Sequence, residues 1–285
     1  MKKTLRKLFT VRPFEFLLTV LLKNFPDNYL LKGIRPSNAY YKASSIRVCN
    51  RYGINYRLDI SDYQNWLLYF YCKVDSSFGV LGYLKPADVI LDMGGNIGQT
   101  AMMMAKAAGE QSKIYSFEPF PNTYGMFVSN LKLNPELQKR VVITQCALGN
   151  APSMLQMYKD CESNSGSYRI FTSKAVGKEM IQVPVSTIDI FVKENNLLKI
   201  DLIKIDVEGF EMNVLKGAAT TLQALKPDLF IELNDGSLKE QGSSAVEMLS
   251  FLKKIGYIIF KDGETTEIQN KDVLKHIDIY CQCKN

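Results

Sequence analysis

The chain contains 285 residues, 46% of them hydrophobic, which suits one large α/β domain with an additional segment. Its 35 basic and 29 acidic residues give a net charge of +6, without the basic stripe and interleaved aromatic residues of nucleic-acid-binding domains. Six scattered cysteines without a C-x-x-C pair, and a single histidine, argue against a structural zinc site. Free thiols favour a reducing compartment, so the composition predicts a cytoplasmic protein without a nucleic-acid substrate.

Residues 1–80 are predicted to form a mainly helical extension. Basic residues lead into the apolar run Phe14–Leu22, which is interrupted by Glu15 and is too short to span a bilayer. Two interpretations remain open for this segment. We favour a helix packed on the domain; the alternative is a peripheral amphipathic helix, formed by residues 1–25, on an anionic membrane surface. A short hairpin is expected over Ile46–Cys49 and Tyr56–Ile60, followed by a helix capped by Ser61 or Asp62.

Residues 81–285 alternate predicted strands with helices, which is typical of an α/β fold with a mostly parallel sheet. Residues 149–185 interrupt this alternation with a predicted hairpin around the polar loop 160–167. An acceptor-covering role and a plain surface hairpin are both open for this insertion. The last two strands should form an antiparallel edge. The strands are expected at Val89–Asp92, Lys113–Glu118, Val141–Cys146, Leu202–Asp206, Asp228–Leu233, Tyr257–Phe260 and Ile277–Cys281.

A glycine-rich turn follows the first of these strands. The sequence D-M-G-G-N-I-G ends the strand, and a helix-forming run begins at Thr100, the order found in nucleotide-binding α/β folds. The dinucleotide pattern G-x-G-x-x-G does not fit. A carboxylate before the first glycine suits the positively charged end of S-adenosylmethionine and would repel a pyrophosphate. The alternative is a glycine turn with no ligand. The predicted cofactor contacts here are Asp92, Gly94, Gly95, Asn96 and Gly98.

Further acidic residues are predicted at neighbouring strand ends. Glu118 ends the next strand, twenty residues after Gly98, where an acid can accept hydrogen bonds from ribose hydroxyls. A later strand ends at Asp206, with Glu208 and Glu211 just beyond it. Open α/β sheets bind ligands at the carboxyl ends of their strands, so we expect Asp206 to face the ligand. Acids also favour helix N-termini, which leaves a structural role open for Glu208 and Glu211.

The motifs DMGGNIGQTA, YSFEPFPNTYGMFVSNLKLN, ALGN, VSTIDIF, DLIKIDVEGFEMNVLKGA and PDLFIELN follow the order expected of FkbM-type methyltransferases. From about Asn55 to Leu233 the chain resembles that family. The resemblance implies a Rossmann-like class I methyltransferase sheet, mostly parallel with an antiparallel edge strand, and S-adenosylmethionine as donor. It also implies a hydroxyl acceptor on a sugar or natural product. The residues that match the family's motifs are Asp92, Gly94, Asn96, Gly98 and Glu118 at the cofactor, Asp206 and Glu208 in D-x-E-G, and Glu232 at a later strand end.

Methyl transfer to a hydroxyl requires alignment of the reactants and benefits from a general base or a metal ion. The predicted catalytic residues are Glu208, which is preferred as the base, with Asp206 and Glu232. A second hypothesis places Mg²⁺ on oxygen ligands from Asp206, Glu232 and Asn234. His276 precedes the final strand, and we expect it at the surface, away from the ligand.

The sequence therefore predicts an S-adenosylmethionine-dependent O-methyltransferase that acts on a hydroxyl of a glycan or small natural product. Alternatives are a methyltransferase for a protein, lipid or nucleic acid, a nicotinamide-dependent oxidoreductase, and a non-enzymatic cofactor-binding protein. The missing G-x-G-x-x-G argues against the oxidoreductase. The acids at the strand ends argue against the non-enzymatic protein. No motif indicates the identity of the acceptor or the oligomeric state.

Overall fold

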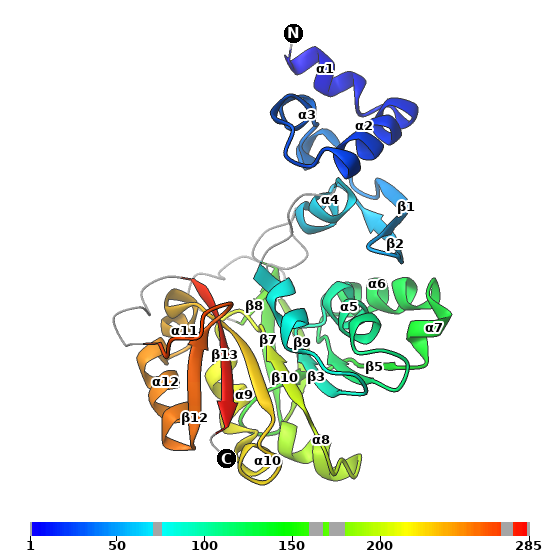
Figure 1. Cartoon of the computed structure of the whole chain (residues 1–285). Coiled ribbons are helices and arrows are strands. Elements are labelled where there is room, and N and C mark those ends of the chain that lie inside the picture. The colour runs from blue at the N-terminus through cyan, green and yellow to red at the C-terminus, as the bar shows by residue number, and fades with distance from the viewer. Residues whose placement is uncertain (1, 71–75, 160–167, 171–179, 269–275, 284–285) are drawn as a thin grey trace. The chain divides into compact units, whose positions relative to one another are not determined.

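The computed structural model describes residues 2–70, 76–159, 168–170, 180–268 and 276–283 (Figure 1). The chain divides into two compact units, with a boundary between residues 75 and 76. The polar loop predicted at 160–167 lies outside the described residues. Among the helices that the structure describes, none combines the length and the apolar character needed to cross a bilayer.

The first unit consists of short helices and one hairpin. The expected hairpin is confirmed, since its two strands pair antiparallel with Ile46 opposite Asp59. Asp62 caps the following helix by accepting a hydrogen bond from the Asn65 backbone at 3.0 Å. The elements are α1 (Lys2–Leu8), α2 (Arg12–Asn24), α3 (Tyr29–Ile34), η1 (Asn38–Tyr40), β1 (Ile46–Arg51), β2 (Ile54–Asp59) and α4 (Tyr63–Tyr69).

Helix α2 packs on this unit through one face. Leu18 and Leu22 are buried there, together with Glu15, whose carboxylate accepts hydrogen bonds from Arg47 at 2.5 and 2.9 Å. The Tyr69 hydroxyl donates a third hydrogen bond to Glu15 at 3.0 Å. A buried carboxylate is stable only when it is paired and hydrogen-bonded, and Glu15 is both. The acid that interrupts the apolar run therefore joins α2 to the hairpin and α4.

The second unit contains a seven-stranded, mostly parallel sheet in the order β12-β13-β11-β10-β3-β4-β5 (Figure 1). Only β13 runs antiparallel, between β11 and β12. This confirms the α/β class and the antiparallel edge. The strands are β3 (Val89–Met93), β4 (Lys113–Phe117), β5 (Val141–Thr144), β10 (Leu202–Ile205), β11 (Asp228–Leu233), β12 (Tyr257–Lys261) and β13 (Ile277–Cys283).

The insertion forms a separate four-stranded sheet in the order β6-β9-β7-β8. Its main pair, β7 and β9, is antiparallel as expected, and two short strands extend it on either side. The strands are β6 (Ala147–Leu148), β7 (Ser153–Lys159), β8 (Tyr168–Ile170) and β9 (Met180–Ser186). The helices of the unit are η2 (Ser76–Tyr83), α5 (Gln99–Ala107), α6 (Pro121–Lys132), α7 (Pro135–Gln138), α8 (Ile188–Glu194), α9 (Glu211–Lys216), α10 (Ala219–Leu225), α11 (Asp235–Glu240) and α12 (Ala245–Lys254).

The strand order creates a switch point between β3 and β10. From β3 the chain moves outward through β4 and β5, then returns to place β10 on the other side of β3. Both central strands are buried on both faces, which explains their apolar sequences. Ligands of open α/β sheets bind beyond the carboxyl ends of the strands at such a switch point. A ligand site is therefore expected at the loops after Met93 and Ile205.

Candidate active site

The loops after β3 and β10 touch each other at the switch point. Gly94 has a φ of +88°, and a Cβ atom on it would lie 2.0 Å from the backbone oxygen of Asp206. The Asp206 N–H donates a hydrogen bond to the Met93 carbonyl at 3.2 Å. At the other end of the turn, a Cβ on Gly98 would lie 2.1 Å from the Phe127 ring. These two glycines are therefore required by packing and by left-handed φ angles, independently of any ligand.

Glu118 follows β4 and faces the glycine turn. Its carboxylate accepts hydrogen bonds from the backbone N–H of Asn96 at 2.8 Å and of Phe120 at 3.0 Å. Burial raises the pKa of Glu118 to about 7, although both N–H groups act in the opposite direction. Within the described structure, the Asn96 Oδ1 and Gln99 Nε2 atoms are buried without a hydrogen-bond partner. Unsatisfied polar atoms beside a strand-end carboxylate fit a polar ligand such as a nucleoside.

A buried lysine lies beneath the glycine turn. Lys204 projects from the middle of β10, where it pairs in register with Asp92 of β3. Its Nζ atom lies 3.5 Å from Asp92 Oδ1, 3.3 Å from Asp206 Oδ2 and 3.3 Å from the Gly94 carbonyl oxygen. Burial alone would lower the pKa of Lys204, but the charges of Asp206 and Asp92 outweigh it and raise that pKa. This triad joins the two loops electrostatically.

Asp92 and Asp206 differ in their exposure to solvent. Asp92 is fully buried, and its second oxygen accepts a hydrogen bond from the Ser116 hydroxyl at 2.6 Å. The Asp206 side chain is 32% exposed. Asp206 is therefore accessible to a ligand at the carboxyl edge of the sheet. Asp92 is not accessible, and it is linked to Asp206 through the ammonium group of Lys204. Lys204 was not among the sequence candidates, although a lysine inside the apolar strand L-I-K-I is a signal for a buried pair.

The D-x-E-G turn, residues 206–209, is held by hydrogen bonds to a buried carboxylate. Glu208 has a φ of +55°, a conformation that costs energy for a residue with a side chain. Glu211 is 1% exposed, and its carboxylate accepts hydrogen bonds from the backbone N–H groups of Val207 at 3.2 Å and Gly209 at 2.9 Å. Glu211 therefore holds the turn, and Glu208, which is half-buried, is the acid that the turn presents.

Glu211 gives the fold a pH dependence. Burial raises its pKa from 4.5 to about 7, so the folded protein holds this proton more tightly than the unfolded chain. That stabilisation is complete below pH 4.5 and is lost as the pH rises through about 7. A shift of this size corresponds to roughly 3 kcal/mol. We expect the wild-type melting temperature to fall between about pH 5 and pH 8, and Glu211→Gln to reduce that fall.

The Glu211→Gln profile needs a matched control. Glu247→Gln changes an acid on α12 whose side chain is 50% exposed, so its melting profile should parallel the wild type. The melting temperature of Glu211→Gln should still depend on pH to some extent, because burial also raises the pKa of Glu118. Differential scanning calorimetry measures the melting temperature as a function of pH. If it falls equally steeply in the wild type and in Glu211→Gln, the assignment of this pH dependence to Glu211 is contradicted.

Glu232 and His276 form a pair at the same edge of the sheet. The His276 Nε2 atom lies 2.7 Å from Glu232 Oε1. The imidazole is 55% exposed and the Glu232 side chain 21% exposed. Burial, followed by the charges of Asp206, Glu208 and Glu211, raises the pKa of Glu232. The expectation that His276 lies away from the ligand edge is wrong, because β13 is antiparallel to β11 and so begins where β11 ends.

The Mg²⁺ hypothesis finds no support in this arrangement. Asn234 Oδ1 accepts hydrogen bonds from the backbone of Gly236 and Ser237 and caps α11. Asp206 is paired with Lys204, and Glu232 with His276. Among the described residues, His, Cys, Asp and Glu side chains do not gather in any group of three or more that could hold a metal ion.

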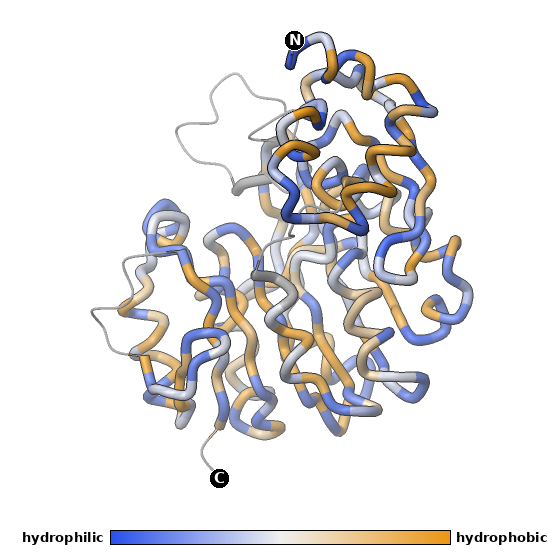
Figure 2. Tube along the Cα trace, turned by 45° about the horizontal axis from the view of Figure 1, so that its top comes forward, coloured by the Kyte–Doolittle hydropathy of each residue, from blue (hydrophilic) through white to orange (hydrophobic). Residues whose placement is uncertain are grey.

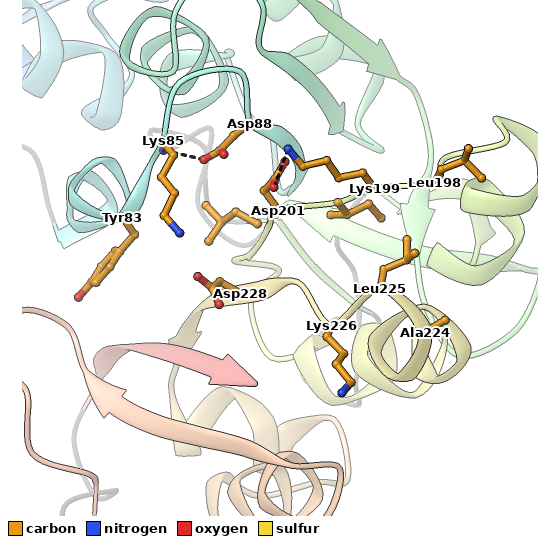
Figure 3. A pocket seen from close by; sticks show the side chains of 12 residues that line it. Tyr83, Lys85, Asp88, Leu198, Lys199, Asp201, Ala224, Leu225, Lys226 and Asp228 are labelled. Carbon is orange, nitrogen blue, oxygen red and sulfur yellow. Dashed lines mark hydrogen bonds and ion pairs between the residues drawn. The ribbon is translucent and has the colours of Figure 1, made fainter. Parts of the chain in front are cut away.

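A polar cavity of about 400 Å³ lies at the opposite edge of the sheet (Figure 3). It is lined at the amino ends of β3, β10 and β11 by Asp88, Asp201 and Asp228, together with lysines. These carboxylates already have internal partners. Asp88 accepts a hydrogen bond from the Lys85 backbone, Asp201 from the Val89 backbone, and Asp228 from the Tyr280 hydroxyl. This cavity contains none of the predicted site residues.

Comparison with known proteins gives a family match within the second unit. Residues 92–259, more than half of the chain, match the sequence profile described as the methyltransferase FkbM domain. The chain belongs to the FkbM methyltransferase family. The matched segment begins at Asp92 and includes the glycine turn, Glu118, the D-x-E-G turn and Glu232.

Two sequence relatives and one solved structure are similar to the chain. The FkbM chain is 34% identical over 163 residues to Methyltransferase 1 of Beauveria bassiana (strain ARSEF 2860), a match covering 51% of this chain and 64% of that protein. It is 26% identical over 149 residues to the hexuronic acid methyltransferase AglP of Haloferax volcanii, covering 52% and 57%. The crystal structure of methyltransferase FkbM from Methylobacillus flagellatus KT has a TM-score of 0.48 at 17% identity, covering 77% and 55%. The chain spans less than two thirds of each relative's length.

Proposed function

We propose that this FkbM-family protein transfers a methyl group from S-adenosylmethionine to a hydroxyl of a glycan or small natural product. The observation that carries the proposal is the Glu232–His276 pair at the carboxyl edge of the sheet, in which an exposed imidazole contacts a carboxyl that is subject to the charges of Asp206 and Glu208. A hydroxyl is a poor nucleophile at neutral pH, so a positioned base is the feature that its methylation requires. The relative named as a hexuronic acid methyltransferase supports a sugar acceptor.

The donor side of the proposed site is the glycine turn with Glu118. The unsatisfied Asn96 and Gln99 atoms and the Glu118 carboxylate suit the polar groups of a nucleoside. S-adenosylmethionine, when bound, supplies a methyl group on a positively charged sulfur. The acidic edge formed by Asp206 and Glu208 favours a cation and would repel the pyrophosphate of a nicotinamide cofactor. In this proposal Gly94, Gly95 and Gly98 shape the turn, and Asp92 positions Asp206 through Lys204.

The acceptor side is the His276 imidazole. With Glu232 ionised and the ring proton on Nε2, the imidazole donates a hydrogen bond to Glu232 and presents the lone pair of Nδ1. Because the pKa of Glu232 is raised, this form of the pair becomes more abundant as the pH rises. Nδ1 then takes the proton of the acceptor hydroxyl, and the Glu232 carboxylate stabilises the imidazolium that results. We therefore revise the choice of base from Glu208 to His276. Glu232 remains in the proposed catalytic group as the partner of the imidazole, and Asp206 and Glu208 remain as the acids whose charges act on Glu232.

The donor assignment predicts a specific loss of affinity. Replacing Glu118 by alanine removes the acceptor for the ribose and also the partner of the Asn96 and Phe120 backbone. We expect the affinity for S-adenosylhomocysteine, measured by isothermal titration calorimetry, to fall at least tenfold, because hydrogen bonds to charged groups contribute about 1.5–3 kcal/mol each. Glu136→Ala on α7 provides a control that should bind as the wild type does. Equal affinities for Glu118→Ala and Glu136→Ala would contradict this donor site.

The proposed reaction is tested with purified protein, labelled S-adenosylmethionine and a panel of acceptors. Uronic acids, neutral sugars and phenolic natural products represent the proposed class; a peptide, a lipid and an RNA represent the alternatives. Label transfer to a sugar or natural-product hydroxyl supports the proposal. Transfer only to one of the alternatives would contradict the acceptor class. Binding of a nicotinamide dinucleotide without binding of S-adenosylhomocysteine would contradict the cofactor as well.

A further inference from the structure

Helix α2 is apolar on both of its faces. One face carries the buried residues that pack on the first unit. The opposite face is formed by Phe16, Leu17 and Val20, which are 66%, 51% and 39% exposed, with Phe14 beside them at 42%. At 100° per residue Phe16, Leu17 and Val20 project away from Leu18 and Leu22, and Phe14 lies one turn before Leu17. A cluster of exposed apolar side chains marks an interaction site, so the patch formed by Phe14, Phe16, Leu17 and Val20, here named the N-terminal surface, calls for a partner.

Apolar exposure is concentrated in this part of the chain. Of the 17 large hydrophobic residues that are exposed in the described structure, nine lie between residues 8 and 30. Tyr29 and Leu30, at the start of α3, are 89% and 80% exposed. Figure 2 shows hydrophobic stretches along the N-terminal helices. Single exposed apolar residues need no explanation, but a cluster of this density marks an interaction surface.

The net charge of the chain lies in the same segment. Residues 1–35 contain eight basic and two acidic residues, a net charge of +6, whereas the remaining 250 residues contain 27 of each. Of the two acids, Glu15 is buried against Arg47 and Asp27 is paired with Lys32. Lys2, Lys3, Lys7 and Lys23 are exposed. The helices therefore combine an apolar face with a surrounding positive charge that nothing else in the chain balances.

We propose that the N-terminal surface docks on an anionic lipid bilayer, with α2 lying in the plane of the headgroups. Apolar side chains that enter the interface while lysines remain at the headgroups are the pattern of interfacial helices. A second copy of this chain would bring the same +6 charge to the contact and repel it. Helix α2 has 13 residues and keeps one face on its own unit, which fits a helix resting on a membrane rather than crossing it.

Co-sedimentation of the full chain with lipid vesicles tests this docking. We expect binding to mixed phosphatidylcholine–phosphatidylglycerol vesicles, and at least tenfold weaker binding to pure phosphatidylcholine, because each basic residue near an anionic surface contributes about 1 kcal/mol. Raising the salt from about 0.1 M to 1 M should also weaken binding, since the Debye length falls to about 3 Å. Phe16→Ser with Leu17→Ser should abolish it. Lys2→Glu, Lys3→Glu and Lys7→Glu together should remove its dependence on anionic lipid.

Matched controls change equally exposed residues in the second unit. Leu198→Ser with Val246→Ser removes apolar side chains that are 90% and 47% exposed and should bind vesicles as the wild type does. The substituted residues of α2 are exposed, so an unchanged melting temperature will show that the fold is intact. Absence of vesicle binding would overturn the proposal. So would a dimer or a complex with an acidic protein that Phe16→Ser with Leu17→Ser abolishes while vesicles remain unbound. A negative result in the methyl-transfer assay would leave this docking result unaffected, because vesicle co-sedimentation does not depend on methyl transfer.

Discussion

Replacing His276 by alanine is expected to lower kcat about 100- to 10,000-fold, the range that a positioned base contributes, while leaving the affinity for S-adenosylhomocysteine unchanged. The imidazole is 55% exposed and hydrogen-bonds to Glu232, so its loss should alter proton removal and little else. Steady-state kinetics with the identified acceptor, together with calorimetry for S-adenosylhomocysteine, separate these two effects. Added imidazole should restore part of the activity, a result that a purely structural role would not produce.

The partner of His276 provides a second test of the same assignment. The amide of Glu232→Gln can donate to Nε2, which would move the ring proton to Nδ1 and remove the lone pair that the acceptor needs. We expect a loss of kcat in the same range, as when the orienting carboxylate of a catalytic histidine is changed to its amide. Glu208→Gln should have a smaller effect. Full activity of His276→Ala together with a large loss in Glu208→Gln would transfer the role of base to Glu208.

Replacing Lys204 by alanine is expected to destabilise the second unit by about 3–5 kcal/mol, because removal of one member of a buried pair leaves an uncompensated charge. Asp92 is fully buried and, among the residues that the structure describes, would retain only the Ser116 hydroxyl as a polar side-chain partner. The loops after β3 and β10 would also lose the Nζ atom that contacts both. We expect a lower midpoint in urea denaturation, with donor affinity reduced at temperatures where the protein remains folded.

A double-mutant cycle tests this explanation. Asp92→Asn removes the charge that Lys204→Ala leaves unpaired, so the double variant should be more stable than Lys204→Ala alone. Lys199→Ala, which removes a lysine whose side chain is 62% exposed, should cost far less. Strictly additive losses in the cycle would show that Asp92 and Lys204 do not depend on each other, and would contradict the proposed link between the two loops.

Much of the second unit was predictable because its central strands are buried on both faces and therefore have short apolar sequences. All seven predicted strands of the main sheet are present, with ends that differ by at most two residues. The strand-end acids were also visible, since polar residues that follow such runs lie at the carboxyl edge. The strands β6 and β8 of the insertion were not predicted, because two or three residues are too few to show a period.

The site residues that escaped prediction depend on the neighbours of each strand. In the sequence, His276 precedes the last strand and is far from the predicted strand ends, whereas the antiparallel direction of β13 brings it beside Glu232. The role of Lys204 depends on the register that sets it opposite Asp92. Glu211 could not be separated from Glu208 by spacing, since only the folded turn shows which acid lies beneath it. Pairing and register arise from tertiary structure and leave no period in the sequence.

The position of β13 has a consequence for how this sheet assembles. β13 is the last of the seven strands in the chain, yet it lies between β11 and β12 and pairs with both. During synthesis, the edges of β11 and β12 that pair with β13 stay without a partner strand until Ile277–Cys283 leaves the ribosome and inserts between them. The same insertion delivers His276, so the nascent protein cannot acquire its proposed base before its sheet has closed.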